Sequence, residues 1–225
     1  MKNLFILGNW KSNKTMTEAA NWLEIFSKNM PQIPGHVSVI VCPGFIHLPL
    51  FSSRTAPFAL GVQNVSAYET GAFTGEIAAS MVANTVSYAM IGHSERRKHL
   101  GETDEVVAEK VKRVLSVGIR PVVCVSDVAQ AEKLAASVPE FTKTGLILYE
   151  PLFAIGSGKS DSPENANIAA GSIHGILPET PILYGGSVTA ENVRGFVGTE
   201  HITGVGVGGA SLDAAKFLSL ISAAL

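Results

Sequence analysis

The sequence has little net charge and no long apolar run. Seventeen basic and nineteen acidic side chains give a net charge of −2, with no block of one sign. This excludes the electrostatic footprint of a protein that binds nucleic acid or an anionic membrane. No apolar stretch approaches the roughly 18 residues that a membrane-spanning helix needs. An anionic ligand would therefore need a local cluster of positive groups.

Cysteine is also scarce. Cys42 and Cys124 are the only two, each lies near the end of an apolar run, and they form no CxxC pair. The pattern excludes a disulfide-stabilised secreted fold and predicts buried free thiols in a reducing compartment. The residues from Met1 to Leu4 lack the pattern of a signal peptide. We therefore expect a soluble, cytoplasmic protein.

What is present is an alternation of short β-rich runs and helical patterns, which is typical of a parallel sheet covered by helices. Eight strand–helix units are enough to close a barrel, and 225 residues suit one such domain. We predict a single (β/α)8 barrel over residues 1–225, with a helical shell shortened around the fifth and sixth strands. The expected strands are residues 4–8, 37–42, 58–62, 88–92, 121–125, 146–150, 182–185 and 204–207.

Three helices have recognisable starts. Thr15 and Glu18 have the spacing of a capping box. Ser162 is a candidate N-cap because a proline and an acid follow it, and Ser211 is expected to open the last helix. Weaker helical patterns cover residues 46–53 and 127–137.

Residues 146–159 carry the clearest chemical signal. An apolar run ends in Tyr149 and Glu150, and Pro151 stops the strand because it has no N–H and a fixed φ. Glu150 is thus left at the C-terminal mouth of the sheet, where α/β proteins keep their chemistry. The small residues that follow have backbone N–H groups able to bind an anion. This stretch alone fits either a catalytic base or a surface salt bridge.

Four other strands also end in polar or glycine-rich motifs. Asn9 and Lys11 lie on one face at the end of the first strand, and His93 ends the fourth. Alone, Lys11 would be interpreted as a surface lysine and His93 as a structural histidine. In order along the whole chain, the five segments closely resemble triosephosphate isomerase, a family of TIM barrels. They are Gly8-Asn9-Trp10-Lys11-Ser12-Asn13, Ile91-Gly92-His93-Ser94-Glu95-Arg96-Arg97, residues 146–159, Tyr184-Gly185-Gly186-Ser187-Val188 and Gly206-Val207-Gly208-Gly209-Ala210-Ser211.

The resemblance implies interconversion of dihydroxyacetone phosphate and D-glyceraldehyde 3-phosphate, in glycolysis and gluconeogenesis, without metal or organic cofactor. Glu150 matches the base that moves a proton between C1 and C2. His93 matches the electrophilic imidazole, which in this family is kept neutral by a helix N-terminus. Lys11 matches the cation that stabilises the enediolate. Asn9 is similar to the donor beside that lysine, and Glu95 to the carboxylate that pairs with it.

The resemblance also implies a phosphate site and a lid. Backbone or hydroxyl donors for the phosphate are expected from Gly156, Ser187, Gly208 and Gly209, with the partial positive charge of a last helix that opens near Ser211. Residues 151–159 resemble the family's lid, whose closure excludes water. Exclusion of water protects the enediolate phosphate from losing its phosphate group.

The loop at residues 67–76 resembles one that reaches into a neighbouring subunit. In such an arrangement Thr74 lies near the partner's Asn9 and the partner's His93. The resemblance therefore implies a homodimer whose substrate is a small phosphorylated triose. The shortened shell resembles compact tetrameric relatives, so a tetramer stays open.

Several positions depart from the family pattern. Gly206 stands where a leucine usually helps to cage the catalytic carboxylate together with the lid isoleucine, here Ile155. A weaker cage would desolvate the carboxylate less and lower its basicity, so we expect Gly206→Leu to keep or improve kcat. The other departures are Ser12 for methionine, Phe153 for tryptophan, Ser126-Asp127 for Gly-Glu, and a short segment between Asp127 and Leu146.

Two other functions stay open. A barrel that binds a sugar phosphate without turnover would serve as a scaffold or sensor, although it would have no reason to keep Asn9, Lys11, His93 and Glu150 together. A different phosphate-dependent barrel isomerase, of an amino-sugar or indole pathway, lacks support from the GNWK and GHSERR motifs. The remaining histidines fit no metal-ligand spacing; they are His36, His47, His99, His174 and His201.

Overall fold

Eight parallel strands close into a barrel in chain order in the computed structural model, which describes residues 2–52, 57–154 and 160–225. The register runs from Leu4 opposite Val37 round to Gly8 opposite Val207. The predicted barrel is confirmed, and every strand boundary lies within one residue of its expected position. The strands are β1 Leu4–Asn9, β2 Val37–Cys42, β3 Ala59–Val62, β4 Tyr88–Ile91, β5 Arg120–Val125, β6 Leu146–Tyr149, β7 Ile182–Gly185 and β8 Gly204–Val207.

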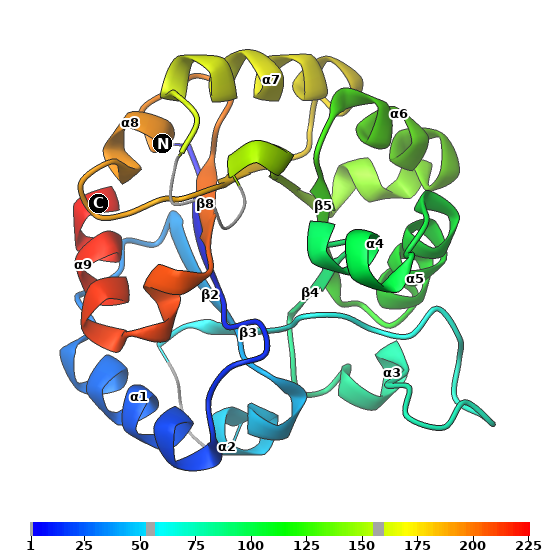
Figure 1. Cartoon of the computed structure of the whole chain (residues 1–225), viewed down its shortest axis with the longest axis horizontal. Coiled ribbons are helices and arrows are strands. Elements are labelled where there is room, and N and C mark those ends of the chain that lie inside the picture. The colour runs from blue at the N-terminus through cyan, green and yellow to red at the C-terminus, as the bar shows by residue number, and fades with distance from the viewer. Residues whose placement is uncertain (1, 53–56, 155–159) are drawn as a thin grey trace.

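A ring of helices surrounds this barrel, as the view along its axis shows (Figure 1). The helices of the described residues are α1 Met16–Asn29, α2 Leu48–Ser52, α3 Ala79–Val82, α4 Ser94–Leu100, α5 Asp104–Ser116, α6 Val128–Ser137, α7 Pro163–Ile176, α8 Val193–Val197 and α9 Ala214–Ala224. Short 3-10 helices are η1 Phe45–His47, η2 Pro139–Lys143, η3 Leu152–Ala154 and η4 Gly209–Leu212. None of the helices in these described ranges is long and apolar enough to cross a membrane.

The connection between β5 and β6 contains little helix. Only the ten-residue helix α6 and the 3-10 helix η2 connect these strands, whereas α7, after β6, keeps 14 residues. The shortening of the shell expected around the fifth and sixth strands stays a prediction. The weak helical pattern at residues 46–53 is divided into η1 and α2.

Two of the three predicted helix starts are confirmed. The Thr15 hydroxyl accepts the Glu18 N–H at 3.3 Å, and the Glu18 carboxylate accepts the Thr15 N–H at 2.7 Å, which completes the capping box. The Ser162 hydroxyl accepts the Asn165 N–H at 3.1 Å and caps α7. These caps orient α1 and α7 against the barrel.

The predicted start of the last helix at Ser211 is wrong. Helix α9 begins at Ala214, where the Asp213 carboxylate accepts the Lys216 N–H at 2.9 Å. Ser211 lies in η4, and its hydroxyl donates to the Gly208 carbonyl at 2.7 Å. The Ser211 side chain therefore stabilises the turn after β8 and does not cap a helix. The helical element that directly follows β8 is η4.

Apolar side chains pack on both faces of the sheet. Between strands and helices, Trp22 stacks on Phe26 with ring centroids 4.4 Å apart and meets Trp10 edge-on at 5.0 Å. A second, smaller cluster fills the barrel interior. Cys42 and Cys124 belong to it as buried free thiols, as predicted, and burial raises the pKa of Cys42 to about 12. The interior cluster forms the floor of the cavity described next.

Candidate active site

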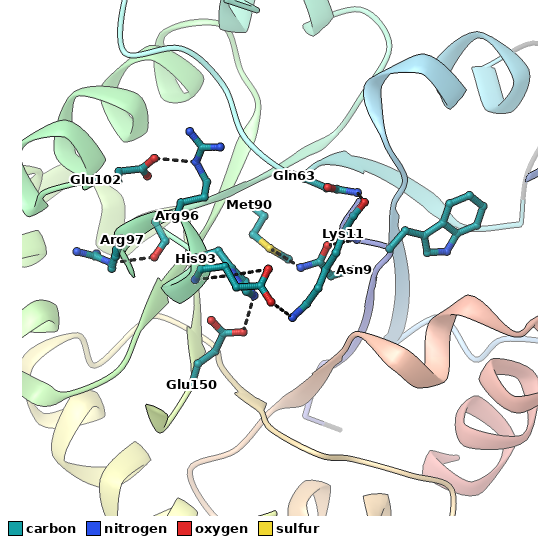
Figure 2. Close-up of polar contacts among 12 residues, drawn as sticks. Asn9, Lys11, Gln63, Met90, His93, Arg96, Arg97, Glu102 and Glu150 are labelled. Atoms are coloured by element: carbon teal, nitrogen blue, oxygen red, sulfur yellow. Dashed lines mark hydrogen bonds and ion pairs between the residues drawn. The ribbon is translucent and has the colours of Figure 1, made fainter. Parts of the chain in front are cut away.

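The predicted catalytic side chains converge on one cavity at the C-terminal ends of the strands. The cavity has a volume of about 560 Å³ and is lined by Asn9, Lys11, His93 and Glu150 together with the turns after β7 and β8. Figure 2 shows these four side chains near one another at the ends of β1, β4 and β6. The barrel therefore brings together residues that are up to 141 positions apart in the sequence.

Lys11 is held in an uncommon backbone conformation. Its φ is +52°, a region that L-residues other than Asn, Asp and His rarely occupy. The Asn9 side-chain oxygen accepts the Lys11 N–H at 2.9 Å, and the Gln63 amide donates to the Lys11 carbonyl at 2.9 Å. Such a conformation costs on the order of 1–3 kcal/mol and is concentrated at functional sites. Asn9 and Gln63 thus fix the direction of the lysine side chain.

The ammonium group of Lys11 forms an ion pair with Glu95, as the resemblance implied. Partial burial acts to raise the pKa of Glu95, but the hydrogen bond from Lys11 and nearby positive charge outweigh it, so that the pKa is lowered. Glu95 therefore stays ionised and keeps the ammonium charge at the edge of the cavity.

His93 caps α4, and this contact decides which ring nitrogen carries the proton. Its Nδ1 accepts the backbone N–H of Glu95 at 3.2 Å. An accepting Nδ1 leaves the ring proton on Nε2 in the neutral imidazole. Nε2 lies 3.3 Å from Oε1 of Glu150, so the N–H of the imidazole points into the cavity.

Glu150 lies one residue beyond β6, and its N–H still donates to the Val125 carbonyl at 2.8 Å. The side chain is buried, with 5% of the residue exposed. While Oε1 faces His93, Oε2 is buried and has no hydrogen-bond partner among the described residues. Burial first, and then the charge of Glu150, raises the pKa of the neighbouring Cys124 thiol well above its ordinary value. The carboxylate thus sits in dry surroundings beside a neutral thiol, as suits a base.

The phosphate side of the cavity is formed by small residues. Gly208 and Gly209 line it where η4 begins, and a side chain at Gly208 would approach Lys11 Cε at 3.3 Å. Ser187 also lines it, and its hydroxyl donates to the Ala154 carbonyl at 3.3 Å. The first N–H groups of a helix have no partner within it, so the start of η4 can donate to an anion. Gly156 lies outside the described residues.

Two contributors were missed by sequence reasoning. Gln63, directly after β3, holds the Lys11 carbonyl, and Leu148 lines the cavity two residues before Glu150. The sequence contains a signal for each of them. Gln63 follows the end of a strand, where Asn9 also lies, and Leu148 shares the inward face of β6 with Glu150. Gln63 lies outside the five recognised segments, and Leu148 lies inside residues 146–159 without having been assigned a role.

A closed parallel barrel with polar residues at its C-terminal mouth places the chain among the α/β-barrel enzymes. Comparison with protein families is more specific. The model of the triosephosphate isomerase family matches residues 4–224, and the chain belongs to that family.

Individual relatives agree over nearly the full length. The chain is 37% identical over 243 residues to the triosephosphate isomerase of Dehalococcoides mccartyi, covering 98% of this chain and 96% of the relative. It is 36% identical over 249 residues to that of Thermus thermophilus, with 98% of both chains covered. With that of Mesomycoplasma hyorhinis it shares 37% identity over 240 residues and 99% of both chains.

Proposed function

We propose that the chain interconverts dihydroxyacetone phosphate and D-glyceraldehyde 3-phosphate through an enediolate, with Glu150 as the base. As a member of the triosephosphate isomerase family, it is an isomerase of triose phosphates. The observation that supports the assignment of roles is the 3.3 Å contact between Glu150 Oε1 and His93 Nε2 inside the cavity. Glu150 is buried at the mouth of the barrel, and in this proposal its carboxylate takes a proton from C1 and returns it to C2.

His93 supplies the electrophile in this proposal. A substrate oxygen that takes the place of Glu150 Oε1 would accept the Nε2–H of the neutral ring. Lys11 and Asn9 stabilise the negative charge that develops on the enediolate, since both groups are already oriented before substrate binds. Glu95 positions Lys11 and does not touch the reacting atoms.

The phosphate dianion binds at the opposite end of the cavity in this proposal. Gly208, Gly209 and Ser187 line that end, while Gly156, expected as a further donor, lies outside the described residues. The reaction belongs to glycolysis and gluconeogenesis in the cytoplasm, a reducing compartment that suits the two free thiols.

The first prediction concerns Glu150. In a coupled assay with D-glyceraldehyde 3-phosphate, Glu150→Gln should lower kcat by about 10²–10⁴-fold, the usual contribution of a general base. Glu164→Gln, at an exposed position in α7, is the matched control and should leave kcat unchanged. Wild-type turnover by Glu150→Gln would remove Glu150 from the mechanism. Binding of a triose phosphate without turnover by the native chain would instead indicate a sugar-phosphate sensor.

We also infer that two copies of the chain associate through the loop around Thr74. The loop projects beyond the ring of helices between β3 and α3 (Figure 1). Its base is fixed by the Arg113 ion pair with Glu69 at 2.5 Å and by stacking of Tyr68 on Phe73. A second cavity, of about 750 Å³, lies beside Lys11 and is suited to receive such a loop. Exposed apolar side chains that association would cover are Ile46, Tyr68, Phe73, Met81 and Leu100.

The second prediction tests this association. Light scattering should give a mass about twice the 23.7 kDa of one chain. Thr74→Arg should lower both that mass and kcat, because the inserted loop supports the partner's Asn9 and the partner's His93. Ile168→Arg, at an exposed apolar residue of α7, should leave the assembly intact. A monomeric native chain would contradict the inference, and a mass four times that of one chain would favour a tetramer.

A further inference from the structure

Two glycines leave the wall of the cavity without side chains beside Glu150. Gly185 at the end of β7 pairs with Gly206 in β8, and both line the cavity. Together they open a space on the inner face of the barrel that a larger residue on either strand would occupy.

The side chain of Leu148 fills this space from β6. A Cβ atom added at Gly206 would lie 2.6 Å from Cδ1 of Leu148, closer than real Cβ contacts, and 3.1 Å from Cδ2, which is tighter than most. A Cβ atom added at Gly185 would lie 3.0 Å from the same Cδ1. Leu148 is itself only 2% exposed. The volume that Gly206 leaves is therefore occupied, and Gly206→Leu alone should lower kcat, contrary to the expectation from sequence.

The same leucine adjoins the carboxylate of Glu150. The point where a Gly185 Cβ would lie is 2.8 Å from Glu150 Cγ as well as 3.0 Å from Leu148 Cδ1, so the two side chains flank one position. Leu148 and Glu150 are two residues apart and line the same cavity. Beside them Oε2 of Glu150 is buried, and the part of the chain that the structure describes offers it no hydrogen-bond partner. An apolar group thus stands where water would otherwise solvate the carboxylate.

We propose that Leu148 is a positioning residue for proton transfer: its methyl groups, held in the space left by Gly185 and Gly206, keep water from Glu150 and fix its side chain. The inference rests on the proposed role of Glu150 as the base. A carboxylate that loses its apolar neighbour becomes better solvated and a weaker base, so the substrate binds as before but its proton moves more slowly.

The test moves the leucine side chain from position 148 in β6 to position 206 in β8. Leu148→Ala should lower kcat about 10-fold with little change in KM, as expected for a weakened base, and should move the acidic limb of the kcat profile to lower pH. Leu148→Ala combined with Gly206→Leu returns an apolar side chain to the same space from β8, and should recover kcat and the pH profile. Leu148→Met, which keeps the volume, should remain close to the native enzyme.

A matched control separates this role from general packing. Leu183 is a buried leucine of the same interior cluster that does not line the cavity. Leu183→Ala should lower the melting temperature and leave the pH profile of kcat unchanged. A native kcat and pH profile in folded Leu148→Ala would overturn the inference, as would a double variant no more active than Leu148→Ala. Absence of turnover in the native chain would instead count against the proposed function.

Discussion

Glu102 is a buried carboxylate that holds two cations. Its Oε2 accepts from Arg96 Nε and from Lys110 Nζ, both at 2.7 Å, and the Lys110 ammonium also donates to Asn64 at 2.8 Å. Figure 2 shows the contact with Arg96. Burial acts to raise the pKa of Glu102, but the hydrogen bonds from Lys110 and Arg96 outweigh it and the pKa is lowered. Asn64 follows Gln63, so this cluster supports the segment that holds Lys11.

Removing this charge should be strongly destabilising. Glu102→Gln leaves the buried ammonium of Lys110 without its counter-ion, and loss of one partner of a buried pair costs about 3–5 kcal/mol. The free energy of unfolding in urea should therefore fall by about that amount. Lys110→Met added to Glu102→Gln should recover part of the loss, because the unpaired charge is then removed.

The exposed pair of Glu109 and Lys112, one turn apart in α5 at 2.8 Å, provides the control. Lys112→Ala should change the free energy of unfolding by less than about 1 kcal/mol. A Glu102→Gln variant as stable as Lys112→Ala would show that the buried cluster contributes nothing to folding.

At the scale of elements, local sequence signals predicted where strands and most helices lie. The apolar run before Glu150 became β6, and Pro151 ends it, while Thr15 and Ser162 cap their helices as expected. These signals succeed because cap hydrogen bonds and the missing N–H of proline act within a few residues.

Sequence signals were insufficient where two local caps compete, and where a distant residue decides the outcome. Ser211 and Asp213 are both competent caps two residues apart, and the hydroxyl of Ser211 is used by the Gly208 carbonyl instead. The sequence shows a glycine at 206, but the leucine that fills its space comes from β6, across β7. The positive φ of Lys11 likewise depends on Gln63, 52 residues away. No local pattern contains such contacts.

At the scale of the whole molecule, three carboxylates tie the α4–α5 side of the barrel together. Glu95 joins α4 to Lys11 after β1, and Glu102 joins α4 to α5. Asp104 accepts from Arg97 of α4 at 2.6 Å and from Lys133 of α6 at 2.8 Å. For each carboxylate burial acts to raise the pKa, and the hydrogen bonds from its cations outweigh burial, so that all three pKa values are lowered.

Lowered carboxylate pKa values predict loss of stability in acid. Below the ordinary glutamate pKa of 4.5 the unfolded chain binds more protons than the folded chain, so the free energy of unfolding falls as the pH falls. These groups should contribute a constant stability between pH 7 and about 5, and the loss should continue through the lowered pKa values of the folded state. Urea unfolding at a series of pH values from 7 to 3 measures this slope.

Glu102→Gln, which lacks one of the three groups, should show a shallower decline below pH 4.5 than the native chain, whereas Glu164→Gln should follow the native curve. A free energy of unfolding that rises on acidification, or equal slopes for the native chain and Glu102→Gln, would show that these ion pairs do not control the acid limit of the fold.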